Sequence, residues 1–412
     1  MCGSAEERVG HMKRRPLRQY LAVGAAVLLV AGVFLAGCTT MSTSVLAPVV
    51  VTVGRPFLIA ESPAYGWGVL SHPRLIKVSD DLIVLRYYVG GDNKNWDNPG
   101  ARDIKGKSPA ISRDGGKTWV FGEEHLDPQV AERTYYWGYD IETEAGTVIG
   151  AKGQAVFMGP GENILAGPWS LVLDTNGFVS GGPWHKGAVL DDGTLIAVSY
   201  ADKAEFRGAK KKKSCYHLLA STDTGLTWVV RSRVAGPEDA PWAHRWPLGF
   251  EGPAEAAIVA LPDNEILCVA RTGMKRKTIF ESAKDSIRMI QSTSPDRGVT
   301  WKHKEMAFEG VYPKMCRMHN NVVVLAFGRP GNNLAFTVNG GFTWGAEVAI
   351  TPPQAKTSGY CDLVEVEPGK LLVVFDLHST DLSGFWLWEP KLQNGIFGVF
   401  VHVKRLVPGG GR

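Results

Sequence analysis

Two hairpin-like segments carry residues that could do chemistry at their ends. The segment "EAAIVALPDNEILCVAR" begins at Glu255 and ends at Arg271, and "SGYCDLVEVEPGKLLVVFD" has Tyr360 near its start. A tyrosine hydroxyl, with a pKa near ~10, is a poor nucleophile until a neighbouring carboxylate takes its proton. A planar guanidinium fork binds a carboxylate better than lysine does. These residue types could therefore support covalent catalysis on an acidic substrate, if the fold brings them together.

An octapeptide that occurs four times indicates how the chain is built. It reads "SRDGGKTW" at 112–119, "STDTGLTW" at 221–228, "SPDRGVTW" at 294–301 and "TVNGGFTW" at 337–344. The Asp side chain can accept backbone N–H groups across a hairpin turn. The Gly at the fifth position can take the positive φ of such a turn, and we expect the Trp to fold onto the apolar face of its own sheet. The repeat thus predicts a structural device that locks turns.

Between these repeats the chain shows short apolar runs separated by turn residues, with almost no helical periodicity. Runs such as "GAVLDDGTLIAVSY" and "NNVVVLAFG" predict strands, and tight turns such as Pro-Asp-Asn join many of them into hairpins. Hairpins recur roughly every 50–60 residues, a spacing typical of propeller blades. We therefore expect an all-β, six-bladed β-propeller over residues 55–412, preceded by a signal segment over 1–37 and a tether over 38–54.

The octapeptides resemble the Asp-box of the sialidase (neuraminidase) superfamily, whose members are six-bladed propellers. The resemblance implies an exo-acting, retaining glycoside hydrolase that removes terminal sialic acid or a related acidic sugar. In that family a tyrosine attacks the sugar, because a carboxylate nucleophile would be repelled by the substrate's own carboxylate. The box also occurs outside sialidases, so function has to be inferred from the site.

The two hairpins match the family's catalytic segments. By this resemblance Tyr360 is the nucleophile, with Cys361 where serine is usual, and Glu255 is its partner base. Arg271 is the second arginine of the clamp for the substrate carboxylate. Glu251 remains a rival for the role of Glu255.

Two further roles follow from the same resemblance. The third clamp arginine is assigned to Arg329 in "GRPGNNLAFTVNGG", with Arg317 as a competitor. The catalytic acid and base is assigned to Asp97 in the loop "DNKNWDNPGARD", which also holds Asp92 and Asp103.

The first blade departs from the family pattern, in which an arginine precedes Ile-Pro. Here the text is "SHPRLI", with Arg74 after the proline, and in one register His72 occupies the arginine position. Because His72 and Arg74 share strand parity, either could face the central funnel. We assign the first clamp position to Arg74, while His72 or Arg86 on the next strand remains an alternative.

Composition excludes several other classes of function. With a net charge of +4 over 412 residues and no nucleic-acid-binding motif, the chain gives no sign of a nucleic-acid partner. The run Lys210–Lys213 is interpreted as a solvated loop. No metal-ligand cluster or nucleotide-binding loop is visible, so we expect no cofactor, although a structural calcium remains open. We expect a monomer whose partner is a glycan.

The N-terminus predicts a membrane anchor. A basic stretch from Lys13 to Arg18 precedes an apolar run ending in "LAGC", and this resembles a bacterial lipobox with Cys38 as the lipidated residue. An ordinary signal peptide or an uncleaved anchor is the alternative, and Met12 offers a second start. We expect the protein in the bacterial cell envelope, at the outer membrane or the cell surface.

Two other functions remain open at this level. One is a hydrolase or lyase acting on another acidic glycan, which the altered "SHPRLI" segment favours. The other is a propeller that binds glycans without catalysis, which would not need a nucleophile and its base.

Overall fold

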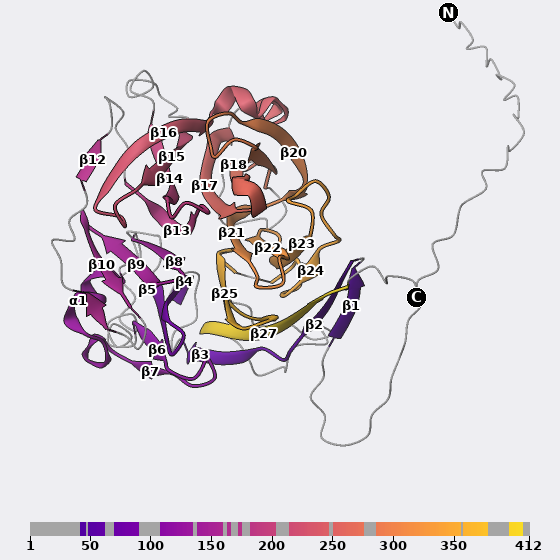
Figure 1. Ribbon diagram of the computed structural model, residues 1–412. Coiled ribbons are helices and arrows are strands. Elements are labelled where there is room, and N and C mark those ends of the chain that lie inside the picture. The colour runs from indigo at the N-terminus through magenta and orange to yellow at the C-terminus, as the bar shows by residue number, and fades with distance from the viewer. Residues whose placement is uncertain are drawn as a thin grey trace, which may run out of the picture. The chain divides into compact units, whose positions relative to one another are not determined.

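The chain is described from a computed structural model and consists mainly of β-strands (Figure 1). The structure describes residues 42–46, 48–61, 70–89, 108–134, 138–159, 163–165, 172–174, 182–202, 214–246, 250–275, 286–355, 357–377 and 395–406. All of them belong to one unit, Thr39–Arg412. Within these ranges, none of the helices has the length and apolar character needed to cross a bilayer.

Groups of antiparallel strands follow one another along the described residues; three are separate four-stranded sheets, two are joined into one nine-stranded sheet by the parallel pairing of β8 with β13, and the last belongs to a six-stranded sheet. The first group comprises β4 (Leu70–Ser79), β5 (Leu82–Val89), β6 (Ala110–Ser112) and β7 (Val120–Phe121). The second comprises β8 (Tyr139–Thr143), β9 (Gly146–Ala151), β10 (Gln154–Met158) and β11 (Ile164–Leu165). The third comprises β13 (Trp184–Val189), β14 (Leu195–Asp202), β15 (Ser214–Ser221) and β16 (Thr227–Ala235). The fourth comprises β17 (Phe250–Ala260), β18 (Ile266–Gly273), β19 (Arg288–Ser294) and β20 (Lys302–Glu309). The fifth comprises β21 (Val311–Arg317), β22 (Val323–Gly328), β23 (Asn332–Thr337) and β24 (Val348–Ala349).

The last group is completed by the N-terminal end of the described chain. It comprises β25 (Cys361–Glu367), β26 (Lys370–Leu377) and β27 (Gly395–Arg405), and β27 pairs with both β2 (Val49–Val53) and β3 (Phe57–Glu61). The remaining elements are β1 (Ser42–Leu46), β12 (Val172–Asp174), the helix α1 (Pro128–Arg133) and the 3-10 turns η3 (Glu123–His125), η6 (Pro237–Asp239), η7 (Pro241–Arg245) and η8 (Pro262–Asn264).

The first strand of each group lies on the inside. Figure 1 shows β13, β21 and β25 nearer the centre than β16 and β20, which lie outside. The inner strands contact one another in the order β4, β8, β13, β17, β21 and β25, and β25 also contacts β4. The prediction of an all-β propeller is confirmed, and the count of six blades stays a prediction.

The four octapeptides join the third and fourth strands of their groups. In the first, Asp114 accepts hydrogen bonds from the N–H groups of Lys117 and Thr118 at 3.0 and 2.9 Å. The fifth-position glycines Gly116, Gly225, Gly298 and Gly341 all have φ between 82° and 87°. The turn-locking role predicted from the sequence is thus seen in the hydrogen bonds, and the positive φ explains the glycine.

The tryptophans of the octapeptides pack between neighbouring sheets. Trp228, on β16, is fully buried among Tyr139 and Val148 of the preceding group and Leu219 of its own. Trp344 likewise packs against residues of both β18 and β22. The expectation that each Trp covers only its own sheet is therefore too narrow: each also fixes its sheet to the one before.

Strand register places the octapeptides at the end of the sheets away from Glu255. In the fourth group Ala254 pairs with Arg271, whereas Ile266, at the other end of β18, pairs with Ser294 of the octapeptide. The same ordering holds in the first group, where Arg74 pairs with Arg86 but Ile83 pairs with Ser112. Glu255 is thus separated from the turn-locking repeats by the length of the sheet.

Candidate active site

β-Bulges near the start of several inner strands turn functional side chains out of the regular alternation. In β4, β17 and β21 two residues face one on the neighbouring strand, and the first of the two is His72, Glu255 or Tyr312. His185 lies in a similar irregularity of β13. All four have φ between 47° and 56°, which is uncommon for residues other than glycine. Such bulges re-aim side chains next to functional sites.

Tyr360 and Glu255 meet in a short hydrogen bond. The Tyr360 hydroxyl donates to Glu255 Oε1 at 2.5 Å, although the two residues come from different sheets. Glu255 Oε2 lies 3.1 Å from Arg271 Nε, and the side chains of both are mostly buried. The three residues that the sequence singled out are thus brought together in one cluster.

The charges of this cluster shift its proton equilibria. Burial raises the pKa of the Tyr360 hydroxyl, and the negative charge of Glu255 raises it further. Burial alone would lower the pKa of Arg271, but the charges of Glu255, Tyr360 and Glu251 raise it above its ordinary value. Tyr360 is therefore a neutral phenol at rest, and Arg271 is a permanent cation.

Glu251 is the second carboxylate on Arg271. Its Oε2 accepts from Arg271 Nη2 at 2.6 Å, and its side chain is 46% exposed. Glu251 therefore does not bond the tyrosine in place of Glu255. Instead it occupies a side of the Arg271 guanidinium group to which a substrate carboxylate would bind.

Arg329 also reaches the tyrosine. Its guanidinium carbon lies 5.5 Å from the centre of the Tyr360 ring, and its Nε donates to the Ser358 carbonyl at 2.8 Å. The close approach depends on Gly359, because a Cβ there would lie 2.5 Å from Arg329 Cγ. Gly359 also has φ +76°, so a larger residue would be strained there as well as crowded.

The first clamp position needs a correction. Arg74 is fully buried, and its Nη2 donates to Asp140 Oδ1 at 2.7 Å. His72 lies beside the nucleophile candidate instead, its ring edge-on to Tyr360 with centroids 4.2 Å apart. The β-bulge at His72 and Pro73 explains why the two side chains have different surroundings. It interrupts the regular alternation of side chains along β4, so His72 and Arg74 no longer face the same side of the sheet.

Arg86 and Arg317 both bond groups away from the tyrosine. Arg86 donates to the Thr134 carbonyl at 2.7 Å and to Glu123 at 2.8 Å, so it does not compensate at the first clamp position. Arg317 bonds Asn321 and the Ala260 carbonyl, far along β21. Asp97, Asp92, Asp103 and the lipidation candidate Cys38 lie outside the described residues, as does the lysine run.

A second tyrosine belongs to the site and was not singled out from the sequence. The rings of Tyr312 and Tyr360 are parallel, with an interplanar angle of 4° and centroids 3.9 Å apart. Tyr312 Oη lies 3.0 Å from His185 Nε2, and the Lys314 ammonium lies 4.3 Å from the centre of the Tyr312 ring. The only hint in the sequence is that "VYPKM" begins an apolar run, as "SHPRL" and "GYCDL" do.

A buried aspartate joins the segments that carry His72 and Tyr360. Asp376, on β26, is fully buried and accepts from the His72 N–H at 3.0 Å. It also accepts from the Ser358 N–H at 2.7 Å, and Ser358 Oγ in turn accepts from the Tyr360 N–H. A single carboxylate thereby fixes the backbone on both sides of the contact between His72 and the tyrosine.

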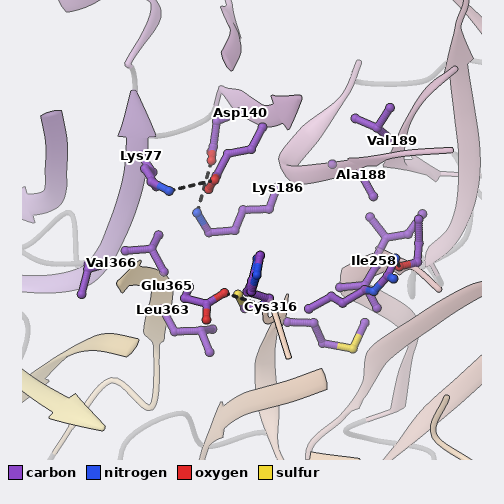
Figure 2. A pocket seen from close by; sticks show the side chains of 18 of the residues that line it. Lys77, Asp140, Lys186, Ala188, Val189, Ile258, Cys316, Leu363, Glu365 and Val366 are labelled. Carbon is purple, nitrogen blue, oxygen red and sulfur yellow. Dashed lines mark hydrogen bonds and ion pairs between the residues drawn. The ribbon is translucent and has the colours of Figure 1, made fainter. Parts of the chain in front are cut away.

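A cavity of about 660 Å³ is lined by residues further along the same inner strands. Figure 2 shows Lys77, Asp140, Lys186 and Glu365 around it. Lys186 Nζ lies 3.2 Å from Asp140, the partner of Arg74, and Lys77 pairs with Glu142. Tyr360, Glu255 and Arg271 are not among its lining residues. We place the chemistry at the tyrosine cluster, because Lys77 and Lys186 in this cavity are already paired with Glu142 and Asp140.

Of the aromatic residues in the chain that are candidates to line a sugar-binding funnel, Trp184, Trp242 and Trp246 are among the described residues. The Trp184 ring lies 4.3 Å from that of His185, next to the tyrosines. Trp242 and Trp246 pack against the core between the third and fourth sheets. Trp67, Tyr135, Tyr136 and Trp137 lie outside the described residues.

No protein-family model matches this chain, and no curated protein matches it. Among solved structures, a protein of unknown function from Dyadobacter fermentans is 17% identical, with a TM-score of 0.54 over 86% of this chain and 99% of that one. Penicillium chrysogenum alpha-L-arabinanase is 14% identical, with a TM-score of 0.48 over 86% and 98% of the two chains. Trypanosoma rangeli sialidase is 12% identical, with a TM-score of 0.46 over 82% of this chain and 55% of that one.

Similarity at these identities concerns the fold. The chain spans about half the length of the Trypanosoma rangeli sialidase structure that it matches. A shared fold does not by itself select a substrate. The arrangement of the described strands is that of a β-propeller.

Proposed function

We propose that the protein is an exo-acting, retaining glycoside hydrolase of the sialidase type, removing terminal sialic acid or a related acidic sugar. The observation that carries this proposal is the 2.5 Å hydrogen bond from the Tyr360 hydroxyl to Glu255, with Arg271 3.1 Å behind the carboxylate. A glycan-binding protein has no need of a nucleophile paired with a base. The pairing therefore favours catalysis over binding alone.

In the proposed reaction the Tyr360 oxygen attacks the anomeric carbon while its proton passes to Glu255. The bond to the leaving oxygen breaks, and a general acid, assigned by resemblance to Asp97, gives that oxygen a proton. Water then attacks the same carbon and loses its proton to that residue. As the bond to Tyr360 breaks, Glu255 returns the proton to the phenol oxygen. Two displacements at one carbon retain the configuration.

The acidic substrate is inferred from the guanidinium groups at the site. Arg271 and Arg329 lie next to Tyr360, and arginine forks bind carboxylates in a bidentate manner. His72 lies beside Tyr360, and in one register it occupies the position of the family's first clamp arginine. This departure specifically favours a second candidate: a hydrolase or lyase acting on an acidic sugar other than sialic acid.

Assays on aryl glycosides test the proposal. The wild-type protein is incubated with 4-methylumbelliferyl glycosides of sialic acid and of a uronic acid, beside a neutral arabinoside, and product configuration is followed by NMR. Cleavage of the sialoside with retention, lost in Tyr360→Phe, supports the sialidase type. Cleavage of the uronide alone supports the second candidate. Glycan binding without cleavage of any acidic glycoside overturns the enzyme proposal.

We also propose that Cys38 anchors the protein by a lipid in the cell envelope, on the strength of the "LAGC" motif. Cys38→Ala should release the protein from the membrane fraction or leave its signal uncleaved, since no acceptor for the lipid remains. Fractionation and intact mass measure both effects. An unchanged distribution and mass would rule the anchor out.

A further inference from the structure

The two parallel tyrosines are held by matching contacts. Tyr360 reaches from the segment before β25 to Glu255 on β17, and Tyr312 reaches from β21 to His185 on β13. Each phenol thus bonds a residue on an inner strand two sheets earlier, and in each case that residue has a positive φ. The Tyr312 ring lies flat against the Tyr360 ring at 3.9 Å.

Tyr312 is more constrained than its neighbour. It is 2% exposed and His185 is 3% exposed, whereas Tyr360 is partly exposed. The hydrogen bond to His185 fixes the phenol end of the ring, and Lys314 lies over the ring at 4.3 Å. A buried ring that is fixed in this way offers a rigid surface for the ring stacked on it.

We propose that Tyr312 is a positioning residue for Tyr360, holding the ring of the nucleophile in line with Glu255, and that His185 fixes Tyr312 in turn. The inference rests on the proposed function, since it assigns Tyr360 the attacking oxygen. Its physical basis is that misplacing a reacting atom by about 1 Å can cost about 100-fold in rate. Without the Tyr312 ring, Tyr360 would lose the surface along one whole face.

Three variants separate stacking, hydrogen bonding and general packing. Tyr312→Leu removes the aromatic face, while Tyr312→Phe keeps it and loses only the bond to His185. Tyr216→Phe is the matched control, because Tyr216 is fully buried and bonds Ser292 at 3.0 Å in another part of the propeller. We expect kcat on the cleaved aryl glycoside to fall about 100-fold in Tyr312→Leu and less than about tenfold in Tyr312→Phe, with KM changed less than about threefold. Tyr216→Phe should retain the wild-type kcat.

A second measurement does not depend on turnover. With tyrosine labelled by ¹³C at the ε carbons, the Tyr360 signal is assigned by its loss in Tyr360→Phe. A ring stacked on Tyr312 should flip slowly, giving two separate or broadened signals, and Tyr312→Leu should merge them into one sharp signal. Tyr312→Phe and Tyr216→Phe should leave the pattern as in the wild type.

The results distinguish this inference from the proposed function. If Tyr312→Leu keeps both the wild-type kcat and the wild-type ring signals, the positioning role is overturned while a loss of activity in Tyr360→Phe still supports the nucleophile. If Tyr360→Phe keeps full activity, the nucleophile is wrong, and the positioning role for catalysis falls with it even where the ring signals change. Merged ring signals together with a fall in kcat and an unchanged KM support the inference.

Discussion

Tyr360 with Glu255 and Tyr312 with His185 are two versions of one arrangement, in which a phenol crosses between sheets to a residue at a bulged strand. The distances are similar, 2.5 Å in the first pair and 3.0 Å in the second. Each ring also has a cation over it, Arg329 in the first and Lys314 in the second. What differs is the chemistry of the partner and its access to solvent.

The difference decides which phenol can lose its proton. Glu255 becomes neutral when it accepts a proton, so the transfer removes a charge from a mostly buried carboxylate. His185 would become a cation instead, and its pKa is held well below the ordinary value by burial and by the nearby charges of Lys314, Arg74 and Lys186. A buried imidazole among cations is a hydrogen-bond partner but a poor base. The same geometry thus gives one pair suited to covalent catalysis and one suited to support.

The largest expected effect comes from breaking the first pair at the nucleophile. Tyr360→Phe removes the attacking oxygen and keeps the ring, so kcat on the cleaved aryl glycoside should fall by about 10⁴-fold or more, the scale of losing a covalent nucleophile. The melting temperature should change little. Steady-state kinetics compares this loss with that in Tyr312→Phe. Equal losses in the two variants would mean that the pairs do not differ as proposed.

Glu255→Gln breaks the same pair at the base. The amide cannot take the phenol proton, and we expect kcat to fall by about 10²- to 10³-fold. Because both residues act on one step, the double variant with Tyr360→Phe should be no worse than Tyr360→Phe alone. A double variant whose loss equals the product of the single losses would contradict a shared step.

Arg271→Lys tests the cation behind the first pair. Lysine keeps the charge but not the fork that meets Glu255 and Glu251, so KM for an acidic substrate should rise about tenfold and kcat should fall as well. Arg317→Lys is the control, since Arg317 bonds Asn321 away from the site. If KM is unchanged in Arg271→Lys, this arginine does not bind the substrate.

Sequence reasoning found the first pair but not the second, and the physical reasons differ. The hairpin from Glu255 to Arg271 has a turn, Pro262-Asp263-Asn264, whose Asp and Asn both adopt φ +61°, as their types allow. Register then follows from the turn, and the ends of the hairpin must meet. The tyrosine segment is similar, with Gly359 marking a close approach. Local residue types therefore indicate that Glu255 and Arg271 meet, whereas Tyr360 was grouped with them through the resemblance to the sialidase family.

The β-bulges could not be predicted from the sequence. Glu255 and Tyr312 adopt a positive φ although their residue types rarely do, so nothing in their types indicates it. Strand parity made His72 and Arg74 equivalent candidates, and the bulge between Ser71 and Arg74 removed that equivalence. Tyr312 looked like an ordinary apolar residue at a strand start. Its role depends on partners from other sheets, which local pattern does not encode.

Lys314, which lies over the Tyr312 ring of the second pair, should make the free energy of unfolding depend on pH. Burial lowers its pKa to about 7, with Arg74 and Lys186 adding to the effect and Asp362 and Asp140 opposing it. Because the unfolded lysine holds its proton up to about pH 10.4, folding favours the neutral amine, and stability should rise as pH increases from about 7 toward that value. Lys314→Met should remove this rise, on the order of 3 kcal/mol between pH 6 and pH 9.5.

Urea unfolding of the wild type and of Lys314→Met at several pH values measures this slope. The exposed Lys302 provides the control, because Lys302→Met should leave the pH dependence of unfolding as in the wild type. If the curves of wild type and Lys314→Met run parallel from pH 6 to pH 9.5, the ammonium group of Lys314 is not destabilised by its surroundings.

The smallest expected effect concerns Glu251. This carboxylate bonds Arg271 at rest, and a bound substrate would take its place. Its carboxylate holds Arg271 Nη2 at 2.6 Å, yet the side chain is 46% exposed, so the ion pair is weak and easily displaced. A substrate carboxylate would compete with Glu251 for the same guanidinium. Glu251→Gln should therefore lower KM for an acidic aryl glycoside about threefold, with kcat unchanged, because only ground-state competition is removed. Glu305→Gln, which breaks the ion pair with Arg288 outside the site, should leave KM unchanged. A rise in KM in Glu251→Gln would show that Glu251 orients Arg271 for the substrate and does not compete with it, which would make this carboxylate part of the binding site.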